Sequence, residues 1–75
     1  MAETIVGGLM GVAKVVEIIG SSEKSWEDAV NQAVKRACKT VRNISGVEVV
    51  GQTAKVSNGK VVEYRTVCKI VFRVE

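Results

Sequence analysis

Residues 12–28, VAKVVEIIGSSEKSWED, decide the fold of this chain of 75 residues. The first eight of them are rich in β-branched side chains and stop at Gly20, a pattern that is typical of a strand. A short polar loop follows. Ser25 then stands where a helix N-cap is expected, and Asp28, three residues on, predicts an approximate capping box. The stretch therefore predicts a strand that leads through a loop into a helix.

One continuous apolar stripe predicts that the helix runs over residues 26 to about 42. Its members recur at spacings of three and four: Trp26, Ala29, Val30, Ala33, Val34, Ala37, Cys38 and Val41. The alanines allow a sheet to approach closely, and basic residues gather in the last turns, where they suit the helix dipole. Trp26 is expected to pack in the core or at a subunit interface.

The dipeptide Asn58–Gly59 predicts a β-hairpin, because both residues tolerate the positive φ of a type I′ turn. It joins two predicted strands, residues 47–56 and 61–74. Counting from the turn pairs Ser57 with Lys60, Val56 with Val61, Thr53 with Tyr64, Gln52 with Arg65, Val49 with Cys68 and Glu48 with Lys69. Opposite charges in the last pair support this register, which a bulge would shift.

The order of elements predicts an α+β fold of the βαββ type. A right-handed crossover places the first two strands parallel, with room for the third strand between them and antiparallel to both. The prediction is therefore a three-stranded antiparallel sheet of order 1-3-2, wrapped around one helix.

This register gives the sheet two different faces. The predicted core face, under the helix, carries Val47, Val49, Thr53, Val62, Tyr64, Thr66, Cys68, Ile70, Phe72 and Val74. The second face alternates charges with valines: Glu48, Val50, Gln52, Ala54, Glu63, Arg65, Val67, Lys69, Val71 and Arg73. One helix cannot cover both faces. We therefore expect the second face to be buried against other subunits, with its charges in inter-subunit pairs or around a ligand.

Composition restricts the class of protein. Apolar residues form 47% of the chain, more than so small a monomer buries easily, which favours oligomerisation. The net charge is +3, and the basic and acidic residues are interspersed along the chain. Because they form no block of like charge, we predict no nucleic-acid binding. The chain lacks His and has two cysteines, so we expect no zinc site, no enzyme and no catalytic residues. Cys38 and Cys68 are expected to be buried free thiols of a cytoplasmic protein. No run of apolar residues is long enough to predict a membrane span.

Residues 1–11 are apolar and rich in glycine, and they are predicted to lie outside the domain of residues 12–75. Glu3 and the missing basic region argue against a signal peptide. Two interpretations stay open: a flexible tail, or an arm that packs on a neighbouring subunit through Ile5, Val6, Leu9 and Met10.

Several runs of this chain together resemble the dodecin family. They are VVEIIGSSEKSWEDAV, KTVRN, VEVVGQ, NGKVVEYR and VFRVE, and they span residues 12–75, about 85% of the chain. The combination of SWE at the predicted start of the helix, residues 25–27, and EYR in the last predicted strand, residues 63–65, is specific to this family. The resemblance implies the βαββ fold and a hollow shell of twelve subunits. It also implies flavins bound in stacked pairs between subunits, stored or quenched rather than used in catalysis.

The resemblance also implies a ligand site, which this chain alters. The family's flavin-stacking aromatic, usually Trp, corresponds to Gly46, and an acidic residue often found after it corresponds to Gly51. Arg65 corresponds to the residue that faces the flavin edge. Gln52 and Arg73, on the same predicted face, are expected to offer further donors. Since glycine has no π-face, the site for FMN or riboflavin is expected to be weakened or altered.

Two functions therefore remain as predictions. The first is a dodecin-like homododecamer that stores or buffers a small molecule, in particular flavin. The alternative is a structural oligomer without an organic ligand, either free of any ligand or binding calcium, because some dodecin-like proteins without the Trp are associated with cations. Glu48 and Glu63 are the oxygen ligands that we expect to hold Ca²⁺ around a symmetry axis. No metal site within one chain is predicted.

Overall fold

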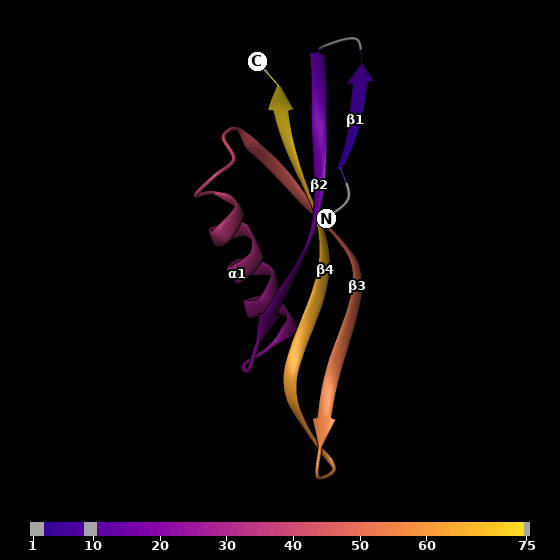
Figure 1. The fold of residues 1–75 in the computed structure, drawn as a ribbon, viewed down its shortest axis with the longest axis vertical. Coiled ribbons are helices and arrows are strands. Elements are labelled where there is room, and N and C mark those ends of the chain that lie inside the picture. Colours follow the sequence, from indigo (N-terminus) through magenta and orange to yellow (C-terminus); the bar gives the residue numbers. More distant parts are fainter. Residues whose placement is uncertain (1–2, 9–10, 75) are drawn as a thin grey trace.

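The computed structural model describes residues 3–8 and 11–74, with side chains from residue 12 onward. In chain order, the elements are β1 (Glu3–Gly8), β2 (Gly11–Ser22), α1 (Trp26–Ala37), β3 (Ile44–Ser57) and β4 (Lys60–Val74). The strands form one antiparallel sheet of order β1-β2-β4-β3, and α1 lies against one side of it (Figure 1). Within the described residues, no helix is long and apolar enough to cross a membrane.

The predicted βαββ unit is confirmed, with one addition. The three predicted strands correspond to β2, β3 and β4, and β4 lies between the other two, so the order 1-3-2 is correct. The prediction of three strands missed β1, which pairs with the first half of β2 from Gly8 opposite Gly11 to Glu3 opposite Val16. Leu9 and Met10, two of the residues through which the N-terminal segment was predicted to pack on a neighbouring subunit, lie outside the described residues.

The helix begins as predicted but ends earlier. The Ser25 side chain accepts the Asp28 backbone N–H at 2.9 Å, as a cap should, while the Asp28 carboxylate accepts the Ser22 hydroxyl at 2.5 Å instead of reaching back to Ser25. At the other end α1 stops at Ala37, not near residue 42. The chain there tightens into i→i−3 bonds, such as Thr40 N–H to the Ala37 carbonyl at 3.1 Å.

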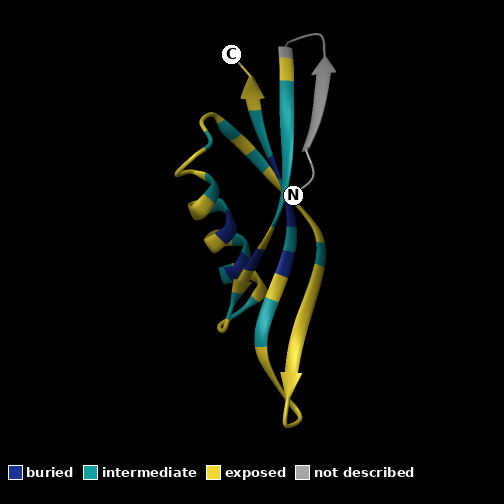
Figure 2. Cartoon of the chain, viewed as in Figure 1, coloured by how far each residue is buried: buried dark blue, intermediate teal, exposed yellow. Residues whose placement is uncertain are grey.

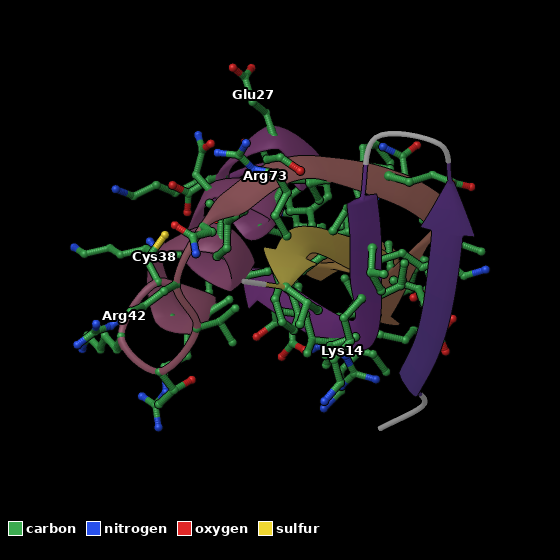
Figure 3. The ribbon with its side chains drawn as sticks, turned by 90° about the horizontal axis from the view of Figure 1, so that it is seen from above. Lys14, Glu27, Cys38, Arg42 and Arg73 are labelled. Atoms are coloured by element: carbon green, nitrogen blue, oxygen red, sulfur yellow. The ribbon has the colours of Figure 1, made fainter. Side chains whose placement is uncertain are left out.

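This early end corrects the prediction for one cysteine. Cys38 is the C-cap residue, and its side chain is exposed (Figure 3), whereas Cys68 is buried and its thiol donates to the Thr66 hydroxyl at 3.4 Å. Both thiols are free. The apolar stripe suggested that Cys38 faces the core, but the stripe continues past the residue at which the helical geometry ends.

The two thiols are expected to differ in reactivity, because only a thiolate that a reagent can reach will react. Titration of the native protein with a thiol reagent should show Cys38 reacting fast and Cys68 only after denaturation. The variant Cys38→Ser is the control and should remove the fast phase. Two fast phases in the native protein would contradict the burial of Cys68.

The β3–β4 hairpin confirms the predicted turn and both ends of the predicted register. Asn58 and Gly59 have φ of 52° and 75°, Ser57 faces Lys60, and Glu48 faces Lys69. Between these ends the register is shifted by one residue, so Thr53 faces Arg65 rather than Tyr64. Two bulges cause the shift, because Val62 is the extra residue on β4 and Val50 the extra residue on β3.

The core lies between α1 and the strands β2 and β4. It is formed by the buried residues Ala29, Ala33, Thr66, Cys68 and Ile70. Gly20 of β2 permits the contact with α1, since a Cβ at this position would lie 2.2 Å from the Ala29 carbonyl oxygen and 2.9 Å from the Ala33 Cβ.

Strand β3 lies beyond the reach of the helix, which corrects part of the predicted core face. Val47 and Val49 face the same side as Ile70 and Cys68, yet they are 40% and 42% exposed. Figure 2 shows β3 mostly in the colour of exposed residues, while blue and teal segments concentrate on α1, β2 and β4. One helix of twelve residues covers two strands of this sheet and leaves the third open.

The hairpin continues beyond the helix as a two-stranded arm, residues 54–63 (Figure 1). Trp26 holds its base: the Trp26 indole N–H donates to the Thr53 carbonyl at 3.0 Å, and its ring meets Tyr64 edge to face at 4.9 Å. Trp26 is 37% exposed, so it joins the helix start to the arm rather than filling the core.

Candidate functional site

The face of the sheet opposite α1, which we call the open face, is not covered by any described residue of the chain. Three rows cross it from β2 through β4 to β3: Val15–Val71–Gly46, Glu17–Lys69–Glu48 and Ile19–Val67–Gly51. Directly opposed residues of antiparallel strands point to the same side, so the members of each row are neighbours. A charged row is thus flanked by two apolar rows.

The charged row carries two carboxylates and one ammonium group. Among the described residues, no salt bridge engages Glu17, Lys69 or Glu48, and Glu48 is exposed. The row therefore has an excess of negative charge between two apolar rows. Sequence reasoning identified Glu48 opposite Lys69, but it missed Glu17, which only the pairing of β2 with β4 brings into the row.

The two glycines give the open face free space. A Cβ at Gly46 or at Gly51 would have no neighbouring atom within 4 Å, and neither residue has positive φ. Each glycine ends an apolar row, beside Val71 and Val67 respectively. The open face can therefore accept an added side chain or a bound molecule at these two positions without moving the backbone.

Gly46 and Arg73 are the predicted site residues that the structure brings together. Gly46 faces Val71, and Arg73 follows two residues later on the same side of β4, where it is exposed. Figure 3 shows Arg73 and Lys14 on opposite sides of the sheet, as their alternation in the register requires. The Arg73 backbone N–H donates to the Asn43 carbonyl at 3.1 Å, which ties this end of β4 to the segment before β3.

Arg65 lies on the open face but far from Gly46 and Arg73. Eight residues of strand separate Arg65 from Arg73, a span of roughly 26 Å. The Arg65 Nε donates to the Glu63 carboxylate at 2.5 Å, and the two side chains are 48% and 32% exposed. Arg65 therefore has a partner within its own strand, and one small ligand cannot contact both arginines of a single chain.

Gln52 lies on the other side of the sheet, which corrects its predicted face. It faces Thr66, a residue of the helix side, whereas Thr53 faces Arg65. The bulge at Val50 exchanges the two sides for the residues that follow it. Sequence alone placed Gln52 with Arg65 because a valine in a bulge looks like any other strand residue.

The described residues contain no group of three side chains able to hold a metal ion. Glu48 and Glu63, the predicted oxygen ligands for Ca²⁺, are fifteen positions apart in sequence and lie in different parts of the open face: Glu48 in the charged row and Glu63 beside Arg65. A cation site built from the described residues would therefore need carboxylates from more than one chain.

Comparisons with known proteins agree with this architecture. The family model described as Dodecin matches residues 12–75, so β1 lies before the matched range. Over 64 residues the chain is 38% identical to calcium dodecin of Mycobacterium tuberculosis and to dodecin of Thermus thermophilus, covering 85% of this chain and 90% and 93% of theirs. A dodecin structure from Streptomyces coelicolor superimposes with a TM-score of 0.81 at 32% identity, covering 84% of this chain and 90% of that one.

Proposed function

Since the chain belongs to the dodecin family, we propose that it is a non-catalytic subunit of a homododecameric shell that binds small molecules on its open face. The observation that carries this proposal is the uncovered face itself. Its apolar rows include Ile19, which is 67% exposed. Burying such a face between subunits gains about 25 cal/mol per Å² of apolar surface, which a small domain with a marginal core needs. The two free thiols fit a reducing compartment such as the cytoplasm.

The ligand that the open face suits best is a planar, partly anionic molecule, and we propose a flavin bound weakly. The row of Val15, Val71 and Gly46 offers a flat apolar surface for a ring system. Arg73, two residues from Val71, offers hydrogen bonds to a carbonyl or phosphate oxygen. Gly46 supplies no aromatic ring to stack on the flavin, so the affinity should be low.

Native mass spectrometry with and without FMN tests both parts of the proposal. The expected result is a twelve-subunit mass that gains flavin increments only at high FMN concentrations. Riboflavin is the control for the phosphate group: loss of the Arg73–phosphate contact should weaken it relative to FMN. A monomeric mass would reject the shell. A dodecamer that never gains flavin, with a melting temperature that FMN does not change, would reject the ligand.

A cation is the second candidate ligand, favoured by the charged row. Glu17 and Glu48 flank a single lysine and have no ion pair among the described residues. Symmetry-related copies could bring such carboxylates together, and carboxylates are the ligands that Ca²⁺ prefers. One relative that is 38% identical is named calcium dodecin, which supports this candidate.

Removal of calcium should then weaken the assembly. We expect EDTA to lower the melting temperature of the oligomer and added Ca²⁺ to restore it, because a ligand that binds only the native state stabilises that state. The variant Glu48→Gln should abolish the response, whereas Glu23→Gln, in an exposed loop, should keep it. A wild-type protein that responds to neither EDTA nor Ca²⁺ would exclude the cation.

A further inference from the structure

A groove runs between α1 and β2, on the side of the sheet that the open face does not use. Its volume is about 570 Å³. Its lining is mostly apolar and includes Val16, Ile18, Ala37 and Ile70, while Gln32, Arg36 and Thr40 of α1 and its C-terminal extension add polar groups. Nothing in the proposed flavin or cation site involves this groove.

One wall of the groove is an open strand edge. Strand β1 pairs with β2 only as far as Val16, so residues 17–22 of β2 have β4 as their single strand partner among the described residues. Ile18, Gly20 and Ser21 belong to this stretch and also line the groove. Alternate N–H and C=O groups of such an edge are free to pair with another strand.

The arm exposes apolar side chains to solvent. Val56, Val61 and Val62 are 61%, 45% and 41% exposed on it. Within the arm, β3 pairs with β4 alone, so its outer edge is also open. A two-stranded ribbon is marginally stable in water unless it packs on another surface.

We propose that the arm of a second copy lies in this groove and adds its β3 strand to residues 17–22 of β2. The inference rests on the proposed oligomer and names the surfaces through which its copies meet. Ala54 and Val56 share one side of the arm strand and would cover the mostly apolar lining, while Lys55 and Ser57 would face outward.

Topology favours a second copy over the chain's own arm. A chain cannot fill its own groove, because the arm belongs to β3 and β4, on the side of β2 away from the open edge. Each copy would give one arm and accept one, which is a head-to-tail contact that closes into a ring or shell.

Strand β1 restricts this contact. It lies before the range that matches the family model, and it covers the edge of β2 along residues 11–16. Along this edge of β2, only residues 17–22 therefore have no second strand among the described residues. An arriving strand is thus confined to the stretch beside the groove.

Hydrogen exchange followed by mass spectrometry tests the contact. In the wild-type oligomer, the amides of residues 17–22 that face the open edge should exchange slowly. The variant Val56→Glu places a carboxylate against a mostly apolar groove, so it should speed their exchange roughly tenfold or more, while residues 64–72 of β4 stay protected. Val74→Glu is the matched control, since Val74 is 49% exposed at the far end of the sheet. It should leave residues 17–22 protected.

A disulfide trap gives a second measurement that does not depend on how Val56→Glu folds. In a Cys38→Ser background, Gln32→Cys with Val56→Cys should link chains under oxidation, whereas Lys35→Cys with Val56→Cys should not, because Lys35 does not line the groove. An assembled oligomer whose residues 17–22 exchange fast, or that links through Lys35→Cys alone, would overturn the inference and leave the shell intact. A monomeric wild-type protein would instead overturn the proposed function, and the inference with it.

Discussion

Replacing Gly20 by alanine is expected to destabilise the fold by about 3 kcal/mol, near the upper end of overpacking effects in a tight core. The added Cβ would lie 2.2 Å from the Ala29 carbonyl oxygen, which is backbone and cannot turn aside. To accept the methyl group, α1 and β2 must separate along their line of closest contact. A domain of this size has a stability of only several kcal/mol, so the loss is a large fraction of the total.

Urea denaturation and thermal melting measure this effect. At roughly 4–8 °C for each kcal/mol, the melting temperature of Gly20→Ala should fall by about 12–24 °C. Gly51→Ala is the matched control, because Gly51 is also a strand glycine without positive φ but has no atom within 4 Å of the added Cβ. It should change the free energy of unfolding by less than about 0.5 kcal/mol. Equal stability of the two variants would contradict the close contact between helix and sheet.

Replacing Gly46 by tryptophan is expected to tighten FMN binding by roughly tenfold to a hundredfold. The new indole would supply the stacking surface that the open face lacks, and stacking on an aromatic side chain contributes about 1–3 kcal/mol. The side chain has room, since nothing lies within 4 Å of a Cβ at this position. The fold should therefore keep its stability while the ligand gains a contact.

Quenching of FMN fluorescence measures the change in affinity. Gly51→Trp is the control, because it adds the same side chain to the open face in equally free space, but beside Val67 rather than Val71. If FMN lies over the row of Gly46 and near Arg73, only Gly46→Trp should tighten binding. Equal gains from both variants would mean that the indole acts nonspecifically, and no gain from either would exclude the proposed flavin position.

The elements of the fold could be predicted because each has a strong local signal. The apolar stripe and the Ser25 cap indicate α1, and Asn58–Gly59 fixes the hairpin. The end of α1 could not be predicted, because the apolar spacing continues past Ala37 although the backbone tightens there. Strand β1 was missed because its glycine-rich sequence has low strand propensity. Its strand conformation is stabilised by hydrogen bonding to β2, which the local sequence does not reveal.

The register shows most clearly what sequence could not provide. The bulges at Val62 and Val50 lie on opposite strands, so the second restores the pairing that the first displaced. Counting from the turn therefore predicted the correct partner for Val56 and again for Val49, and the wrong partners only between the two bulges. The predicted faces were affected accordingly: Arg73 lies on the same face as Arg65, as predicted, whereas Gln52, which lies between the bulges, does not.

The position of β4 has a consequence for how the chain reaches this structure. β4 joins β2 to β3, yet it follows both in the sequence. During synthesis, β2 and β3 leave the ribosome before the strand that each must pair with. Before β4 is synthesised, only the β1–β2 hairpin and the hydrogen bonds within α1 can form from segments that are already present. The nascent chain must therefore delay formation of the β2–β4–β3 sheet until residues 60–74 are free, and the valines of β2 and β3 stay without their strand partner for that interval.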